Sequence, residues 1–252
     1  MVSSVTAWLP GYSGGSALVL ARVAGLAWTA PALATPGLGW RFRLALAVLL
    51  AAVLLPVVEP MARPPDGPAA LGRACLIEGL IGAALGWSAA LVVAGARQAG
   101  EIVGVQAGLS PAALLDPDAG DGLTPLGHLY ALIALASFLA LDGPLALVKA
   151  LIESYRVLPA GGAVLSEATV GLAFGRVGRA LELTLRLAAP TALALVLAGV
   201  ALGLLGRAAP SLQLMVLSLP ARWALGLVLV FLGLIALAAS LAAAWRGWPG
   251  GW

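Results

Sequence analysis

Charged residues are scarce in this chain of 252 residues: 10% are Asp, Glu, Lys or Arg, whereas 62% are apolar. Soluble domains carry about 25% charged residues and about 45–50% apolar ones. A soluble core of this length could not bury the apolar excess, because small domains leave much of their surface in water. The composition therefore predicts a polytopic membrane protein.

Cysteine and histidine occur only once each, as Cys75 and His128. A single cysteine excludes a secreted disulfide scaffold, and these two residues alone are too few for a zinc site. The 14 basic residues are scattered singly among 11 acidic ones, which argues against a nucleic-acid binder. No Lys or Arg precedes Arg22, so the charged start of a cleavable signal peptide is missing. We expect the first apolar segment to stay in the mature protein.

Long apolar stretches alternate with breaks that are rich in Pro and Gly. Strand signals are absent, and the dominant residues, Ala and Leu, favour helix. We predict a single all-α membrane domain over residues 1–252. A membrane helix needs ~20 apolar residues, so the stretch 44–58 is short, whereas the other stretches are long enough. The apolar stretches are 16–34, 44–58, 74–96, 126–148, 187–206 and 223–244.

The arginines of the first two connections give no orientation by the positive-inside rule. Arg41 and Arg43 lie in one connection, and Arg63 and Arg73 lie in the next. Because each connection carries two arginines, neither side of the membrane has an excess of positive charge, and two explanations remain open. Either the stretch 44–58 is not a simple span, or the protein matures in an assembly that overrides ordinary topology.

Glycines recur at four-residue spacing, which allows helix backbones to approach closely in lipid. Glycine is common in membrane helices in general, so a single pair carries little weight. The triple at 100, 104 and 108 is harder to attribute to composition, and it predicts a tightly packed helix face. The spaced glycines are Gly82 and Gly86, then Gly100, Gly104 and Gly108, then Gly199 and Gly203.

Charges within apolar segments cost at least ~2.5 kcal/mol each at the bilayer centre, so we expect them to face protein or water. Three pairs stand four residues apart on one helix face, where they can neutralise each other. An ion relay is the alternative, but the acids form no row. Glu78 has no partner nearby in sequence and is expected to meet another helix or subunit. The pairs are Arg97 with Glu101, Lys149 with Glu153, and Glu182 with Arg186.

Three motifs of catalysis or ligand binding fail on inspection. Gly11-Tyr12-Ser13-Gly14-Gly15 fits G-x-S-x-G formally, but no strand precedes it. A Ser13–His128 intramembrane hydrolase is therefore a remote alternative. Asp116, Asp118 and Asp121 do not match the ligand spacing of an EF-hand. No phosphate loop is present. We expect no catalytic role, no cofactor and no metal.

The most informative part of the sequence runs from residue 78 to residue 162. Residues 100–110 read Gly-Glu-Ile-Val-Gly-Val-Gln-Ala-Gly-Leu-Ser, and Asp116-Pro117 follows. Residues 153–161 read Glu-Ser-Tyr-Arg-Val-Leu-Pro-Ala-Gly. Together with Arg22 near the start and residues 210–214 near the end, this pattern resembles the FliR family of flagellar export-gate proteins, whose virulence relatives are called SctT. In one departure, Gly143-Pro144 stands where the family usually has Gly-His.

The resemblance implies a structural subunit of the flagellar type III protein export gate in the bacterial inner membrane, within the flagellar basal body. Its implied partners are P-type and Q-type subunits, an FlhB-type protein and membrane lipid. Unfolded flagellar proteins would pass through this assembly of helical hairpins. The equivalent T subunit of a virulence injectisome is the nearest alternative.

Residues 109–125 form a Pro-, Asp- and Gly-containing loop between apolar segments. Irregular backbone at membrane depth is tolerated only inside protein or beside water, and apolar constrictions can close a pore by dewetting. Composition alone favours an ordinary surface turn, whereas the resemblance implies a plug in the export channel. The residues implied in this plug loop are Gln106, Gly108, Leu109, Ser110, Leu114, Leu115, Asp116 and Pro117.

Overall fold

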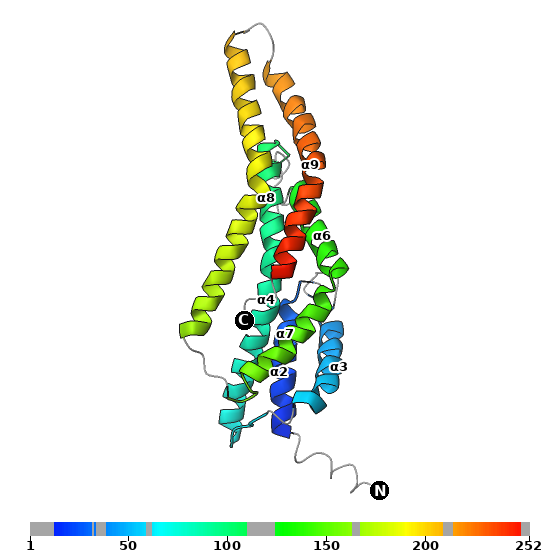
Figure 1. The fold of residues 1–252 in the computed structure, drawn as a ribbon, viewed down its shortest axis with the longest axis vertical. Coiled ribbons are helices and arrows are strands. Elements are labelled where there is room, and N and C mark those ends of the chain that lie inside the picture. Colours follow the sequence, from blue (N-terminus) through cyan, green and yellow to red (C-terminus); the bar gives the residue numbers. More distant parts are fainter. Residues whose placement is uncertain are drawn as a thin grey trace. The chain divides into compact units, whose positions relative to one another are not determined.

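The computed structural model describes residues 13–31, 33, 39–58, 62–109, 124–162, 167–208 and 214–247. Within these ranges the chain forms seven helices and no strand (Figure 1), which confirms the predicted all-α fold. The helices are α2 (Ser13–Thr29), α3 (Trp40–Val58), α4 (Pro68–Gln106), α6 (Pro125–Ala140), α7 (Gly143–Val157), α8 (Glu167–Ala208) and α9 (Leu214–Gly247).

Four segments of the described chain are long and apolar enough to cross a membrane: α3, α4, the part of α8 over Val177–Ala201, and the part of α9 over Trp223–Gly247. The bent pair α6 and α7 would make a fifth if it counts as one span. The short apolar stretch predicted over 44–58 lies within α3. The helix begins four residues earlier, at Trp40, and its 19 residues are long and apolar enough to cross a membrane.

The apolar stretch predicted over 126–148 is broken in the structure. α6 ends at Ala140, and Asp142 adopts a left-handed conformation with a φ of 55°, a region in which Asp is among the tolerated residues. α7 then starts with Gly143-Pro144. Pro144 lies in the first turn, where a missing N–H breaks no helical hydrogen bond. The Gly-Pro departure from the family pattern is therefore compatible with a helix start.

Two helices are much longer than the hydrocarbon core of a bilayer, which is about 30 Å thick. α4 has 39 residues and α8 has 42, so they are about 58 Å and about 63 Å long. The hydropathy pattern predicted only residues 187–206 of α8. Its first part was missed because exposed charges interrupt the apolar run there, at Arg179, Glu182 and Arg186. Neither helix fits entirely in lipid, so part of each must be covered by protein or water.

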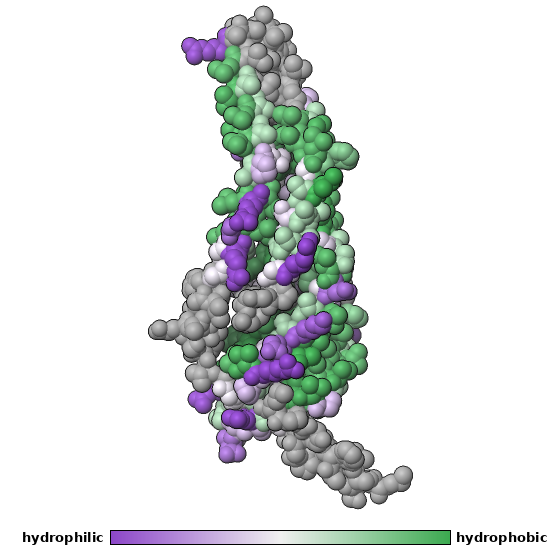
Figure 2. Space-filling model, in the orientation of Figure 1, coloured by the Kyte–Doolittle hydropathy of each residue, from purple (hydrophilic) through white to green (hydrophobic). Residues whose placement is uncertain are grey.

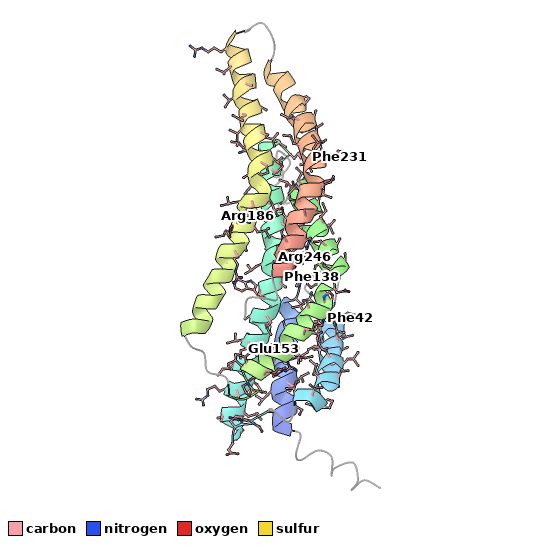
Figure 3. All side chains as sticks on the ribbon, in the orientation of Figure 1. Phe42, Phe138, Glu153, Arg186, Phe231 and Arg246 are labelled. Atoms are coloured by element: carbon pink, nitrogen blue, oxygen red, sulfur yellow. The ribbon has the colours of Figure 1, made fainter. Side chains whose placement is uncertain are left out.

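Contacts divide the chain into two compact units: residues 1–91 with 142–176, and residues 92–141 with 177–252. The first unit contains α2, α3, α7 and the first part of α4; α2 is its most buried helix, with Leu18, Val19 and Val23 fully enclosed. The second contains the end of α4, α6, α9 and most of α8. There the ring of Phe138, labelled in Figure 3, contacts the ring of Trp245 at a tilt of 50°, with the centroids 4.8 Å apart. The single domain expected over residues 1–252 stays a prediction.

Large apolar side chains cover much of the outside of both units. In the second unit, apolar residues cover much of the described surface of α8 and α9 (Figure 2). Leu197 on α8 and Ile235 on α9 are exposed, as is Phe231 on α9, which is labelled in Figure 3. Such surfaces mark contact with lipid or with other proteins.

Candidate functional site

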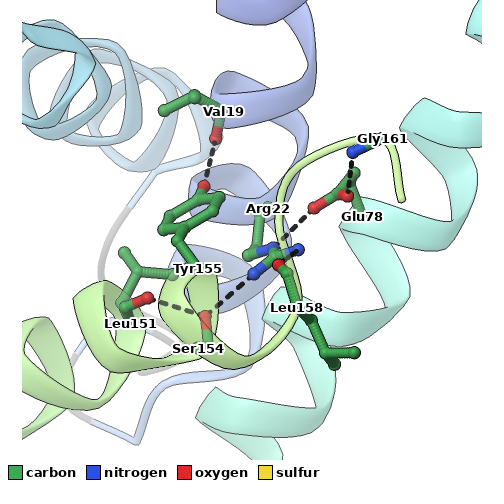
Figure 4. Close-up of polar contacts among 8 residues, drawn as sticks. All are labelled: Val19, Arg22, Glu78, Leu151, Ser154, Tyr155, Leu158 and Gly161. Atoms are coloured by element: carbon green, nitrogen blue, oxygen red, sulfur yellow. Dashed lines mark hydrogen bonds and ion pairs between the residues drawn. The ribbon is translucent and has the colours of Figure 1, made fainter. Parts of the chain in front are cut away.

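A buried ion pair forms the centre of a polar cluster in the first unit (Figure 4). Arg22 on α2 is 0% exposed and Glu78 on α4 is 1% exposed. The Arg22 Nε–H donates to Glu78 Oε2 at 2.5 Å. A buried carboxylate or guanidinium without a partner would be strongly destabilising, so each residue makes the other tolerable in this position.

The remaining donors of Arg22 bind α7 and the turn that follows it. One terminal nitrogen donates to Ser154 Oγ at 3.0 Å, and the other donates to the carbonyl oxygen of Leu158 at 3.0 Å. The guanidinium carbon also lies 4.1 Å from the centroid of the Tyr155 ring, in cation–π geometry. Arg22 therefore connects α2 to both α4 and α7.

The turn after α7 is held from two further sides. Glu78 Oε1 accepts the Gly161 N–H at 2.9 Å, and the Arg63 N–H donates to the carbonyl oxygen of Ala160 at 2.7 Å. Gly161 has a φ of +85°, and a Cβ there would collide with the backbone carbonyl of Arg63. Only glycine both adopts this positive φ without strain and lacks the Cβ for which there is no room. The cluster holds the turn at residues 158–162 in place, and the hydrogen bonds of its polar groups join α2, α4 and α7 to this turn.

Close approach of α2 and α4 brings Arg22 and Glu78 together. A Cβ at Gly82 would collide with the carbonyl oxygen of Arg22, and a Cβ at Gly86 would collide with Thr29 Oγ1. Thr29 Oγ1 donates to the carbonyl oxygen of Ala83 at 2.9 Å across the same contact. The glycine spacing thus corresponds, at these two positions, to a helix contact within the chain.

In the second unit, α4 ends in a Schellman motif just before the proposed plug loop. The Leu109 N–H donates to the carbonyl oxygen of Gly104 at 2.9 Å, and the Gly108 N–H donates to that of Val105 at 3.0 Å. Gly108 has a φ of 75°, the left-handed conformation that this motif requires. Gly108 therefore ends the helix, and Gln106, the last residue of α4, is exposed.

Glu101, which lies one to two turns before the end of α4, holds the other end of the same loop. Its carboxylate oxygens accept the Thr124 N–H at 3.1 and 3.0 Å. Thr124 in turn caps α6, because its Oγ1 accepts the Gly127 N–H at 3.1 Å. A Cβ at Gly104 would collide with the Thr124 side chain. A Cβ at Gly100 would lie 2.5 Å from the carbonyl oxygen of Leu126, so this glycine also permits a contact within the chain.

Residues 110–123 lie outside the described residues, among them Ser110, Leu114, Leu115, Asp116 and Pro117 of the predicted plug. The described residues on either side show that α4 holds both ends. Trp223 on α9 adds a third contact, since its indole N–H donates to the carbonyl oxygen of Gly108 at 3.0 Å. The composition of the sequence did not indicate that Trp223 contacts this loop.

Most of these charges are exposed within this chain, and two of the three pairs predicted from spacing do not form, which corrects that part of the prediction. Arg97 and Lys149 are exposed, and Glu153 pairs with Arg156 at 3.0 Å instead of with Lys149. Glu101 is half-buried and binds Thr124 instead of Arg97. The sequence shows which residues share a helix, but it does not show which face of that helix packs inward.

Glu182 and Arg186 do form the predicted pair, at 2.5 Å, but their side chains are 56% and 73% exposed. An exposed pair with this spacing contributes about 0.3–0.5 kcal/mol. Replacing both, with Glu182→Gln and Arg186→Leu, should change the stability of the chain by no more than that and leave secretion intact. Thermal unfolding and a secretion assay check this. An assembled double variant that no longer exports would instead assign the pair a role in ion movement.

The fold and these two clusters define a helical membrane protein whose buried polar groups hold helices and a loop in position. A family model described as "Bacterial export proteins, family 1" matches residues 15–247. The chain therefore belongs to this family, to which the FliR resemblance pointed.

Curated relatives support the same assignment. The "Flagellar biosynthetic protein FliR" of Caulobacter vibrioides is 31% identical over 88% of this chain and 89% of its own length. That of Escherichia coli is 34% identical over 84% of this chain and 80% of its own length. The "Yop proteins translocation protein T" of Yersinia pestis is 31% identical over only 60% of this chain and 59% of its own length. The family match and these relatives confirm the predicted function, a subunit of the flagellar type III protein export gate.

Proposed function

We propose that this chain is a structural subunit of the export channel and that residues 110–123 form its plug. The single observation that carries the proposal is the way α4 holds both ends of this segment, through Gly104 to Leu109 and through Glu101 to Thr124. A closed gate must exclude water and ions and still yield to an unfolded chain. A segment that the helices hold at both ends is suited to such a gate, because apolar side chains can close a pore by dewetting.

The partners that we propose are the P-type and Q-type gate subunits and an FlhB-type protein, with unfolded flagellar proteins as the transported substrates. The exposed apolar surfaces of α8 and α9 support this, because they need covering by protein or lipid. The lengths of α4 and α8 support it too, since they exceed what a bilayer alone would cover. We place the assembly in the bacterial inner membrane, within the flagellar basal body.

The flagellar system is favoured over the injectisome because the flagellar relatives match a larger share of both chains. We propose no catalytic role. The hydrolase alternative has no support in the family match, and His128 on α6 is exposed, with no side-chain hydrogen bond to another described residue. The relatives are named for flagellar biosynthesis and translocation, which fits a component of a secretion apparatus.

Coexpression and complementation test the proposal together. The tagged chain should purify in one complex with the P-type and Q-type proteins of its own bacterium. In a strain of that bacterium lacking the native gene, the chain should restore swimming and hook-protein secretion. A chain that restores secretion without binding either partner, or binds both without restoring it, would contradict the proposed role.

A further inference from the structure

The contacts at the two ends of the proposed plug loop differ in strength. At the Thr124 end, the charged Glu101 carboxylate accepts the N–H through both oxygens, and Thr124 is 2% exposed. At the Gly108 end, the described bond from another helix comes from the neutral indole of Trp223, which is 39% exposed. Hydrogen bonds to charged groups are roughly twice as strong as neutral ones. Contacts with other helices therefore hold the start of the loop less firmly than its end.

A glycine of α9 packs against the same end of α4. Gly226 lies one turn after Trp223, on the same face of α9. A Cβ at Gly226 would lie 2.9 Å from the Cβ of Ala107, which is fully buried. Neither Cβ can rotate away, so a larger residue at 226 would separate α9 from the end of α4. We call Trp223 and Gly226, with the Ala107 and Gly108 that they contact, the α9 latch.

The bond from Trp223 is separate from the cap that ends α4. In the Schellman motif the N–H groups of Gly108 and Leu109 bond back to carbonyl oxygens of the helix, whereas the carbonyl of Gly108 takes no part. The indole N–H of Trp223 binds this carbonyl from outside. Loss of the indole N–H would therefore leave the helix cap intact and remove a contact that α9 alone supplies.

A proline stands beside the latch in α9. Pro220 lies inside the helix, one turn before Trp223. A proline in a helix interior removes one backbone hydrogen bond, and sharp bends of helices occur at such positions. A bend of α9 at Pro220 would act directly on the position of Trp223.

We propose that Trp223 is a positioning residue for the proposed plug: through the α9 latch it holds the start of the loop, and the strength of this contact sets how often the closed channel conducts. The inference rests on the proposed function, because it needs residues 110–123 to form the barrier. It adds that α9, which flanks the loop at neither end, controls that barrier.

Removal of the indole N–H tests the hydrogen bond of the latch. Trp223→Phe keeps an aromatic ring and loses the donor, so it should raise the frequency of conducting events of the purified complex in a planar bilayer by roughly two- to tenfold. Trp245→Phe is the matched control, because Trp245 donates a bond of the same 3.0 Å from the same helix, but to Ser137 Oγ. The control should conduct like the parent. A Trp223→Phe complex as tight as the parent, or equal leakage in Trp245→Phe, would overturn the latch.

Exchange of a methyl group across the contact tests the packing of the latch. Gly226→Ala should also raise the frequency of conducting events, because the new Cβ pushes α9 away from Ala107. Adding Ala107→Gly removes the collision and should return conduction to the parental level. Gly233→Ala is the control on the same helix, since its Cβ meets nothing within 4 Å among the described residues. A double variant that leaks as much as Gly226→Ala, or a Gly226→Ala complex as tight as Gly233→Ala, would overturn the role of this contact.

A deletion of residues 112–116, measured beside these variants, separates the latch from the proposed function. If the deletion complex conducts and Trp223→Phe stays tight, the latch is wrong and the plug stands. If the deletion complex stays tight, the plug is wrong, and the latch, which acts through that loop, is wrong with it.

Discussion

Replacing Arg22 with methionine should destabilise the first unit by about 3–5 kcal/mol, because it leaves the buried Glu78 carboxylate without its cation. Ser154 Oγ and the Leu158 carbonyl lose their donor at the same time. Proteins of this size are stable by only about 5–15 kcal/mol, so a loss this large should prevent the chain from accumulating in a folded state. Thermal unfolding of the detergent-solubilised chain, followed by loss of the monodisperse peak in size-exclusion chromatography, measures the effect.

Two further variants separate the ion pair from general effects of losing an arginine. Arg156→Met removes an arginine whose pair with Glu153 is largely exposed, and it should change stability by less than about 1 kcal/mol. Arg22→Met combined with Glu78→Gln should recover part of the stability, because the neutral side chain can still accept the Gly161 N–H. If the double variant is less stable than Arg22→Met alone, the charge argument fails.

Gly82→Leu should be comparably severe, for a steric reason. A single Cβ at this position would collide with the carbonyl oxygen of Arg22, which is backbone and cannot rotate away. α2 and α4 would have to separate, and the Arg22–Glu78 pair and the bond from Thr29 to Ala83 would break with them. Overpacking alone costs about 1–3 kcal/mol, and the lost polar contacts add to it. The chain should therefore fail to assemble with its partners when coexpressed.

Gly72→Leu provides the matched control on the same helix. Gly72 is exposed on α4, and a Cβ there meets nothing within 4 Å among the described residues. Assembly and thermal stability of this variant should equal those of the parent. A Gly82→Leu chain that assembles and melts like Gly72→Leu would show that α2 and α4 do not approach as closely as the structure has them.

The sequence predicted the helical class and the residues that permit close packing, because both depend on local composition and spacing. At Gly82 and Gly104 the contact is now seen to lie within the chain, against α2 and against Thr124. Spacing alone does not say which helix a glycine meets. At Gly203 a Cβ would meet nothing within 4 Å among the described residues, so the same spacing shows no close helix contact there.

The Arg22–Glu78 pair could not be predicted from spacing, because 56 residues separate the two. Glu78 stood out as a lone acid in an apolar stretch, which was a correct signal that a partner had to exist elsewhere. Its partner is fixed by how α2 packs on α4, and this is a tertiary property. The break at Asp142 was missed because apolar residues continue on both sides, although Asp-Gly-Pro is a sequence that favours a turn.

We propose that this chain helps to close the channel through the loop whose ends α4 holds. Deletion of residues 112–116, around Leu114, removes part of that loop without touching Glu101, Gly104 or Thr124. The most direct measurement is the conductance of the purified complex in a planar bilayer, compared between the parent and the deletion. The deletion complex should assemble normally and conduct small ions, whereas the parent should stay closed. An assembled deletion complex as tight as the parent would contradict it.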